Sequence, residues 1–165
     1  MFDNIKNLED LLEIKLQGLY DAEKQLVKAL PKLASKATDP QLRMSLEKHL
    51  RETETQVTRL EQVAKSLDMD LNGPGCKAME GMIDEANQLL GMRMDDEVLD
   101  AAIISAAQGV EHYEIAQYGT VVDFARRLGH TAEAQSLQAT LSEEKNANET
   151  LNQLAEMSVN EKANS

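Results

Sequence analysis

The sequence AAIISAAQGVEHYEIAQYGTVV, residues 101–122, decides the fold because it is almost entirely apolar and yet contains two charged residues, Glu111 and Glu114. A helix that is apolar nearly all round is normally buried. Side chains four, seven and eleven residues from Glu111 share its helix face. These positions hold Ile104, Ala107, Ile115, Tyr118 and Val122. The segment therefore predicts a core helix that directs a glutamate into the interior.

Three further segments repeat this pattern, in which an ionisable residue interrupts a stripe of leucines. Glu23, His49 and Glu144 each stand at a position where a leucine would continue the stripe. The flanking residues at helical spacing are Leu16, Leu19, Leu26 and Leu30 for Glu23, Leu42, Leu46 and Leu60 for His49, and Leu137, Leu141 and Leu151 for Glu144. Glu52 follows His49 by one turn and shares the edge of its face. Four helices are thus predicted to direct acidic or imidazole side chains inward.

Apolar spacing, capping residues and chain breaks set the expected helix ends. We expect long helices at residues 5–37, 40–67, 96–128 and 131–157, and a short helix at residues 77–90. Asp39 followed by Pro40 is a typical N-cap and first helical residue. Thr131 is an N-cap candidate for the last helix, and Gly129 suits the left-handed position after the preceding one. The polar tail from Val159 is expected to fray.

The order of these helices predicts an all-α chain of one domain. Two long helices, a crossover of about 30 residues that contains a short fifth helix, and two more long helices form a four-helix bundle with one long connection. Ferritin-like bundles have this topology. We assign residues 1–158 to the bundle domain and residues 159–165 to a polar C-terminal tail.

The amino-acid composition limits the cellular compartment and the partners that we expect for the protein. The 165 residues include 17 Lys and Arg against 29 Asp and Glu, a net charge of −12, which disfavours binding to nucleic acid. One cysteine cannot form an internal disulfide, which suits a reducing compartment. The chain has no apolar run long enough to span a membrane and no signal-peptide pattern at its start. We therefore expect a cytoplasmic protein that binds neither nucleic acid nor membrane.

Bound metal is the simplest explanation for several carboxylates that converge in a core. Burying an unpaired carboxylate costs several kcal/mol, and no Lys or Arg occupies the predicted stripes around Glu23, Glu111 or Glu144. A carboxylate-rich site with an imidazole suits iron or manganese, with zinc as a substitute. The candidate metal ligands are Glu23, His49, Glu52, Glu111, Glu114 and Glu144. For any one glutamate, a solvated flank or an interface position is the alternative interpretation.

Two neighbouring positions leave alternatives open. A weak internal repeat aligns residues 50–60 with residues 141–151 and so pairs Glu52 with Glu143. The leucine stripe instead favours Glu144, which we choose as the ligand, with Glu143 as its alternate. His112 points about 100° away from Glu111 and is expected to be a buried polar group or a hydrogen-bond donor to a ligand.

Five segments carry a resemblance to a known family. They are Tyr20–Leu26 (YDAEKQL), His49–Thr53 (HLRET), Cys76–Gly81 (CKAMEG), Val110–Ala116 (VEHYEIA) and Glu143–Lys145 (EEK). The chain resembles the ferritin-like YciE/YciF family of bacterial stress proteins over nearly its whole length. The resemblance implies a rubrerythrin-like four-helix bundle, commonly dimeric, with a di-metal centre, induction under stress and no well-defined substrate.

The sequence departs from the general di-metal pattern at one point. That pattern takes a Glu-x-x-His motif from each of two helices, but Thr55 stands three residues after Glu52, and Asn146 and Ala147 follow the Glu143–Glu144 pair at that spacing. His49 precedes Glu52 instead. With fewer imidazoles, the predicted site is weaker, dominated by carboxylates, or vestigial.

The leading functional hypothesis is a stress-response protein that holds two iron or manganese ions between its helices. In this hypothesis, Glu111 or Glu114 bridges the ions, Glu23 and Glu144 are terminal ligands, and His49 and Glu52 complete the site. Redox chemistry on peroxide or ferrous iron would make it an oxidoreductase, whose substrate and redox partner the sequence does not identify. The alternative is a non-enzymatic homodimer with a structural or interaction role and a weak or vestigial metal site.

Overall fold

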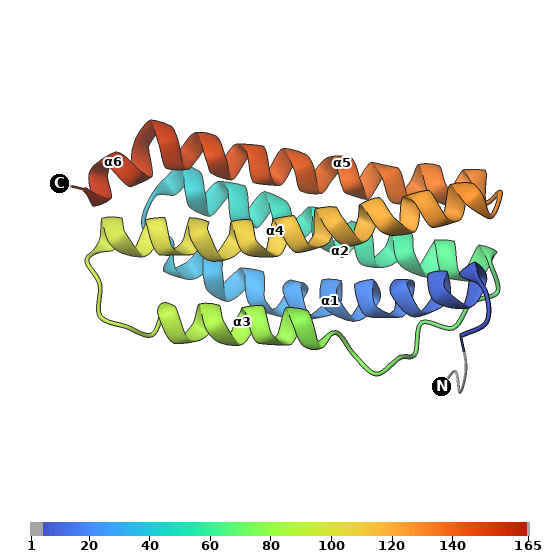
Figure 1. Cartoon of the computed structure of the whole chain (residues 1–165). Helices are drawn as coiled ribbons and strands as arrows, with labels where there is room; N and C mark the ends of the chain where they lie inside the picture. Colours follow the sequence, from blue (N-terminus) through green and yellow to red (C-terminus); the bar gives the residue numbers. More distant parts are fainter. Residues whose placement is uncertain (1–4, 165) are drawn as a thin grey trace.

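A computed structural model describes residues 5–164 of the chain. Four long helices form the bundle, and a short helix lies on the crossover: α1 Leu8–Lys36, α2 Pro40–Ser66, α3 Lys77–Leu89, α4 Asp96–Arg127 and α5 Thr131–Leu154. Helices α1 and α2 pack as one pair, α4 and α5 as the other, and the pairs join through α1 with α4 and α2 with α5. Helix α3 covers part of α1 and α4 from outside (Figure 1). The predicted all-α bundle is confirmed.

Local capping explains two of the predicted helix ends. The Asp39 carboxylate accepts hydrogen bonds from the backbone N–H groups of Gln41 and Leu42, so α2 begins as predicted. Gly129 has φ +83°, a conformation that glycine adopts at little cost, and it ends α4 as expected. Two smaller predictions are wrong: α1 begins at Leu8, after the Asn7 cap, and His130, not Thr131, is the N-cap residue of α5.

The C-terminal segment is more ordered than predicted. A π-helical turn, Ala155–Val159, continues α5 and passes into α6, Asn160–Ala163. Val159 is 2% exposed and belongs to an apolar cluster of the core. Lys162 Nζ lies 3.2 Å from Asp39 Oδ2. Fraying from Val159 is therefore wrong within the described residues; the spacing of four between Leu151, Ala155 and Val159 would have indicated a continued helix.

The core consists of two apolar clusters with polar residues between them along the bundle. One cluster contains Leu26, Leu30, Leu42, Leu46, Met79, Ile103, Ile104 and Leu151. The other contains Leu12, Leu16, Leu19, Leu60, Val121, Val122, Leu137 and Leu141. Each long helix passes from one cluster to the other, and the ionisable residues of the predicted stripes lie at these transitions. The fold therefore places the unusual side chains in the middle of the bundle.

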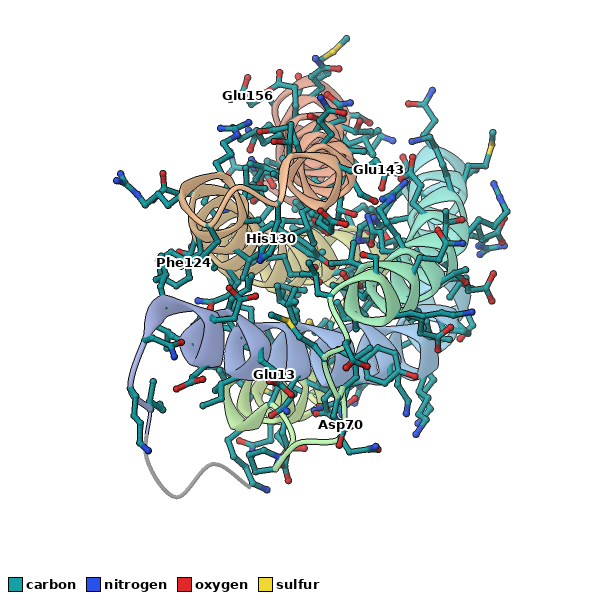
Figure 2. All side chains as sticks on the ribbon, turned by 90° about the vertical axis from the view of Figure 1, so that its right-hand side faces the viewer. Glu13, Asp70, Phe124, His130, Glu143 and Glu156 are labelled. Atoms are coloured by element: carbon teal, nitrogen blue, oxygen red, sulfur yellow. The ribbon has the colours of Figure 1, made fainter. Side chains whose placement is uncertain are left out.

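A polar row on α1 holds the crossover in place. Its members recur every four residues and are Glu13, Gln17, Asp21 and Gln25. The Asp70 backbone N–H donates to Glu13 at 3.0 Å, and the Asp70 carbonyl accepts from Gln17 at 2.8 Å; Figure 2 labels Glu13 and Asp70, which lie near each other on this face. Farther along, the Cys76 backbone N–H donates to Asp21 and its carbonyl accepts from Gln25. This row fixes the path of the chain before α3.

None of the helices within residues 5–164 is both long enough and apolar enough to cross a membrane.

Candidate metal centre

Five ionisable side chains from the four long helices lie in the interior. Glu23, Glu114 and Glu144 are 0% exposed, Glu111 is 2% exposed, and His49 is 5% exposed. Ligand atoms of His49, Glu111, Glu114 and Glu144 lie within 4.8 Å of one another. Glu23 joins this group through its proximity to Glu114 and His49. We call these five residues the interior cluster.

His49 is the cationic partner within the interior cluster. Its Nε2 lies 3.1 Å from Glu111 Oε1 and 3.7 Å from Glu144 Oε2. Burial on its own lowers the pKa of His49, but the neighbouring carboxylates of Glu111 and Glu52 outweigh it and raise the pKa well above the ordinary value. One imidazolium supplies a single positive charge against four glutamates.

Burial and mutual repulsion favour the protonated forms of several of these glutamates. Burial raises the pKa of Glu23 to about 7, although Tyr118 and His49 oppose this shift. Burial, and then the charges of Glu23, Glu144 and Glu111, raise the pKa of Glu114 well above its usual range. The pKa of Glu144 is raised mainly by burial as well. The chain alone does not supply enough positive charge to ionise the whole interior cluster.

Many atoms of the interior cluster have no hydrogen-bond partner. They are Glu23 Oε2, Glu111 Oε2, both carboxylate oxygens of Glu114, Glu144 Oε2 and His49 Nδ1, whereas His49 Nε2 lies within ion-pair distance of Glu111. Within residues 5–164, no Lys or Arg forms an ion pair with these four glutamates. Buried polar groups normally have partners, and each orphaned group costs free energy. These oxygen and nitrogen atoms fit the donor set of iron or manganese.

Glu52 and Glu143 lie outside the interior cluster. The Glu52 side chain is 25% exposed; its Oε1 lies 2.5 Å from Lys48 Nζ and its Oε2 3.8 Å from His49 Nδ1. Glu143 accepts two hydrogen bonds from Arg59, at 2.8 Å and 2.9 Å. It is labelled on α5 in Figure 2. The structure therefore places Glu144, rather than Glu143, in the interior, and places Glu52 at the edge.

His112 is not part of the site. Its side chain is exposed, and its Nδ1 lies 2.8 Å from the Gln108 carbonyl oxygen of the preceding turn. The expectation of a buried or ligand-orienting histidine is therefore wrong, because the rotation away from Glu111 carries the ring to the surface of α4.

Two residues that sequence reasoning did not assign to the site orient its carboxylates. Gln56 is fully buried, and its Nε2 donates to Glu144 Oε1 and, at 3.0 Å, to Glu143 Oε2. Tyr118, treated above as a core residue, donates its hydroxyl to Glu23 Oε1 at 2.5 Å. Gln56 lies seven residues after His49, and Tyr118 seven after Glu111, so helical spacing alone would have indicated both.

Fold and site together define a class: an all-α bundle whose interior contains four buried glutamates and one histidine. The chain belongs to the family described as a domain of unknown function, DUF892, whose pattern matches residues 7–164. This membership agrees with the resemblance found in the sequence.

Solved and curated relatives support the same assignment. Protein YciF of Escherichia coli (strain K12) is 44% identical over 161 residues, which cover 97% of each chain. The crystal structure of the E. coli stress protein YciF matches with a TM-score of 0.91 at 43% identity, covering 94% of this chain and 99% of that one. YcfI from Rhodopseudomonas palustris, described as a proposed structural protein, matches with a TM-score of 0.88 at 46% identity, covering 92% and 97%.

Proposed function

We propose that this protein is a ferritin-like stress-response protein that binds two iron or manganese ions among its four long helices. The observation that carries the proposal is the set of unpartnered, buried carboxylate oxygens on Glu23, Glu111, Glu114 and Glu144. Divalent cations would supply the positive charge that the chain lacks there. Zinc is able to replace either metal at such a donor set.

Each residue has a specific role in this proposal. Glu111 and Glu114 lie three residues apart on α4 and would both hold the ions from that helix. Glu23 from α1 and Glu144 from α5 would add carboxylate oxygens, and His49 would provide the nitrogen. Glu52, at the edge beside His49, would be the outermost ligand. Because His49 must lose its proton to bind metal, affinity is expected to rise with pH.

The surrounding residues would hold the ligands in position. Gln56 donates to one oxygen of Glu144, and Tyr118 donates to one oxygen of Glu23. The apolar clusters pack on either side of the site along the bundle. When bound, iron or manganese supplies one-electron redox chemistry, which suits the reduction of peroxide or the oxidation of ferrous iron. The carboxylates favour the higher oxidation state through their negative charge.

The biological setting follows from the relatives and from composition. The E. coli relative is named a stress protein, and we extend that role to this chain. We propose a cytoplasmic homodimer that binds neither nucleic acid nor membrane, in keeping with its net charge of −12.

A non-enzymatic structural role is the second candidate. The R. palustris relative is described as a proposed structural protein, and the His49–Glu111 pair already neutralises part of the cluster. In this alternative, the remaining glutamates are protonated and the homodimer functions without metal.

Elemental analysis separates the two candidates. The protein is purified from cells supplemented with iron and manganese, alongside Glu111→Ala and the matched control Glu97→Ala, which removes an exposed carboxylate from the same helix. The proposal predicts about two ions per chain in the parent and the control, and a marked loss in Glu111→Ala. A metal-free parent of equal stability would support the structural candidate. Peroxidase and ferroxidase assays on the loaded protein then distinguish an enzyme from an inert metal binder.

A further inference from the structure

A cavity of about 290 Å³ lies beneath α3 and extends to the interior cluster. Residues of α1, α3 and α4 line it, together with His49 and Glu111. Helix α3 packs against α1 and α4, whereas His49 projects from α2. The cavity must therefore pass between α1 and α4 to reach His49. It connects the surface under α3 with two residues of the candidate metal centre.

Most of the cavity wall is hydrocarbon. Its apolar lining includes Leu26, Leu30, Leu33, Met82, Ile83 and Val110. Burying an apolar group against such a surface lowers the free energy of binding, whereas a small, hydrated molecule gains little affinity there. Hydrogen peroxide or ferrous iron would not need a wall of this kind. The occupant that suits it contains an alkyl chain.

The outer rim of the cavity on α1 is basic. Lys28, Lys32 and Lys36 recur every four residues, all exposed and all lining the cavity. Lys28 and Lys32 form no ion pair within residues 5–164, and Lys36 Nζ lies 3.4 Å from the Leu90 carbonyl oxygen. Three adjacent lysines are notable in a chain with 29 acidic and 17 basic residues. They favour an anionic group at the entrance.

The opposite rim, on α3, has fewer charged side chains that lack an ion-pair partner. Glu80 Oε2 lies 2.5 Å from Lys77 Nζ, so Asp84 is the acidic residue of this rim without an ion pair among the described residues. The net charge at the entrance is therefore positive. At the inner end, Glu111 would repel an anionic group. This polarity orients a bound molecule, with its anionic head outward and its apolar chain inward.

We propose that the cavity binds a medium-chain fatty acid, with its carboxylate on the α1 lysines and its alkyl chain directed toward Glu111 and His49. A methylene group occupies about as much space as a liquid water molecule, about 30 Å³, so the cavity accommodates a chain of roughly ten carbons. The biological role of this binding rests on the proposed function, because the end of the alkyl chain would then lie beside the metal ions. Binding itself requires only residues of this chain.

Calorimetric titration of the full-length, metal-free protein tests the proposal. Decanoate, used below its micellar concentration, is expected to bind saturably with one molecule per chain. Decyltrimethylammonium, which has the same chain and a cationic head, should bind at least about tenfold more weakly, and butyrate should show no measurable binding. Absence of decanoate binding, or equal binding of the anion and the cation, would overturn the proposal.

Two kinds of variant locate the ligand. The double change Lys28→Glu and Lys32→Glu alters exposed residues only and should weaken decanoate binding by about tenfold. The matched control Lys145→Glu, an exposed lysine on α5, should leave it unchanged. Ala86→Trp, which fills the cavity from α3, should abolish binding while circular dichroism confirms the fold. Unchanged affinity in both cavity variants would place the ligand elsewhere and refute the assignment.

Metal content, measured on the same preparations, keeps the two proposals separable. Decanoate binding to a protein that never takes up metal would support the cavity assignment and contradict the proposed function. Metal uptake without decanoate binding would do the opposite.

Discussion

Two buried carboxylates on helix α4 contrast in how the chain surrounds them. Asp100 is 4% exposed and accepts three hydrogen bonds, from Thr38 N at 2.7 Å, Thr38 Oγ1 at 2.6 Å and Asp39 N at 2.8 Å. Glu114 is 0% exposed, and neither of its carboxylate oxygens has a hydrogen-bond partner. The described part of the chain supplies hydrogen-bond donors for the Asp100 carboxylate but none for the Glu114 carboxylate.

The difference separates a structural role from a binding role. Asp100 fastens α4 to the turn between α1 and α2, where it holds the backbone just before Pro40. Glu114 makes no comparable contact, and its burial lowers the free energy of unfolding instead. A residue that the fold does not need and that burial penalises is a candidate for ligand binding. If the two residues differ in this way, their loss should affect stability differently.

The largest expected effect is the loss of Asp100. Asp100→Ala leaves two backbone N–H groups and the Thr38 hydroxyl without their acceptor, so the free energy of unfolding should fall by about 3 kcal/mol. Urea denaturation measures the change. Glu97→Ala, which removes an exposed carboxylate from the first turn of the same helix, is the control and should change stability by less than about 1 kcal/mol. A similar, small effect for both variants would remove the structural role of Asp100.

The pH dependence of the metal-free protein is the second test. The pKa of Glu23 is about 7 in the folded chain against an ordinary 4.5. The folded state therefore binds more protons than the unfolded state between these values, and stability falls as pH rises. For Glu23 alone, the expected loss between pH 5 and pH 7 is about 2 kcal/mol. The raised pKa values of Glu114, Glu144 and His49 act in the same direction.

Denaturation in the presence of a chelator measures this dependence. Glu23→Gln should flatten the curve, because the amide does not titrate. Stability that is constant or that rises from pH 5 to pH 7 would contradict the electrostatic description of the interior cluster.

The smallest effect distinguishes the two carboxylates most clearly by its sign. Glu114→Leu removes a buried acid and should stabilise the metal-free chain by about 1 kcal/mol. Asp100→Leu, the matched change, should destabilise it. Thermal unfolding without metal, monitored by circular dichroism, gives both signs. If both changes destabilise the chain, Glu114 has a structural role that its lack of hydrogen bonds does not reveal.

Sequence reasoning succeeded where helical periodicity carried the information. The leucine stripes gave the bundle and placed Glu23, His49 and Glu111 in its interior. It did not identify Asp100, because the acceptor role of that residue depends on a turn that lies 62 residues earlier in the chain. It also missed Gln56, whose partners lie on α5. Local pattern predicts which face a side chain occupies, but only the packing of helices determines what that side chain meets.

The exposed His112 shows how far burial can be predicted from the hydrophobicity of a single helix. The segment around it is apolar on nearly all sides, which favoured burial of every residue in it. In the bundle, α4 packs against α1, α3 and α5, and His112 lies on the remaining face. Overall hydrophobicity therefore indicates that a helix is buried, whereas its neighbours decide which residues remain in solvent.

Anomalous X-ray diffraction from crystals grown with manganese tests the central claim most directly. We expect strong anomalous peaks in the interior, within bonding distance of Glu111, Glu114 and His49. An interior without peaks, in crystals of protein prepared with excess manganese and still containing His49 paired with Glu111, would contradict it.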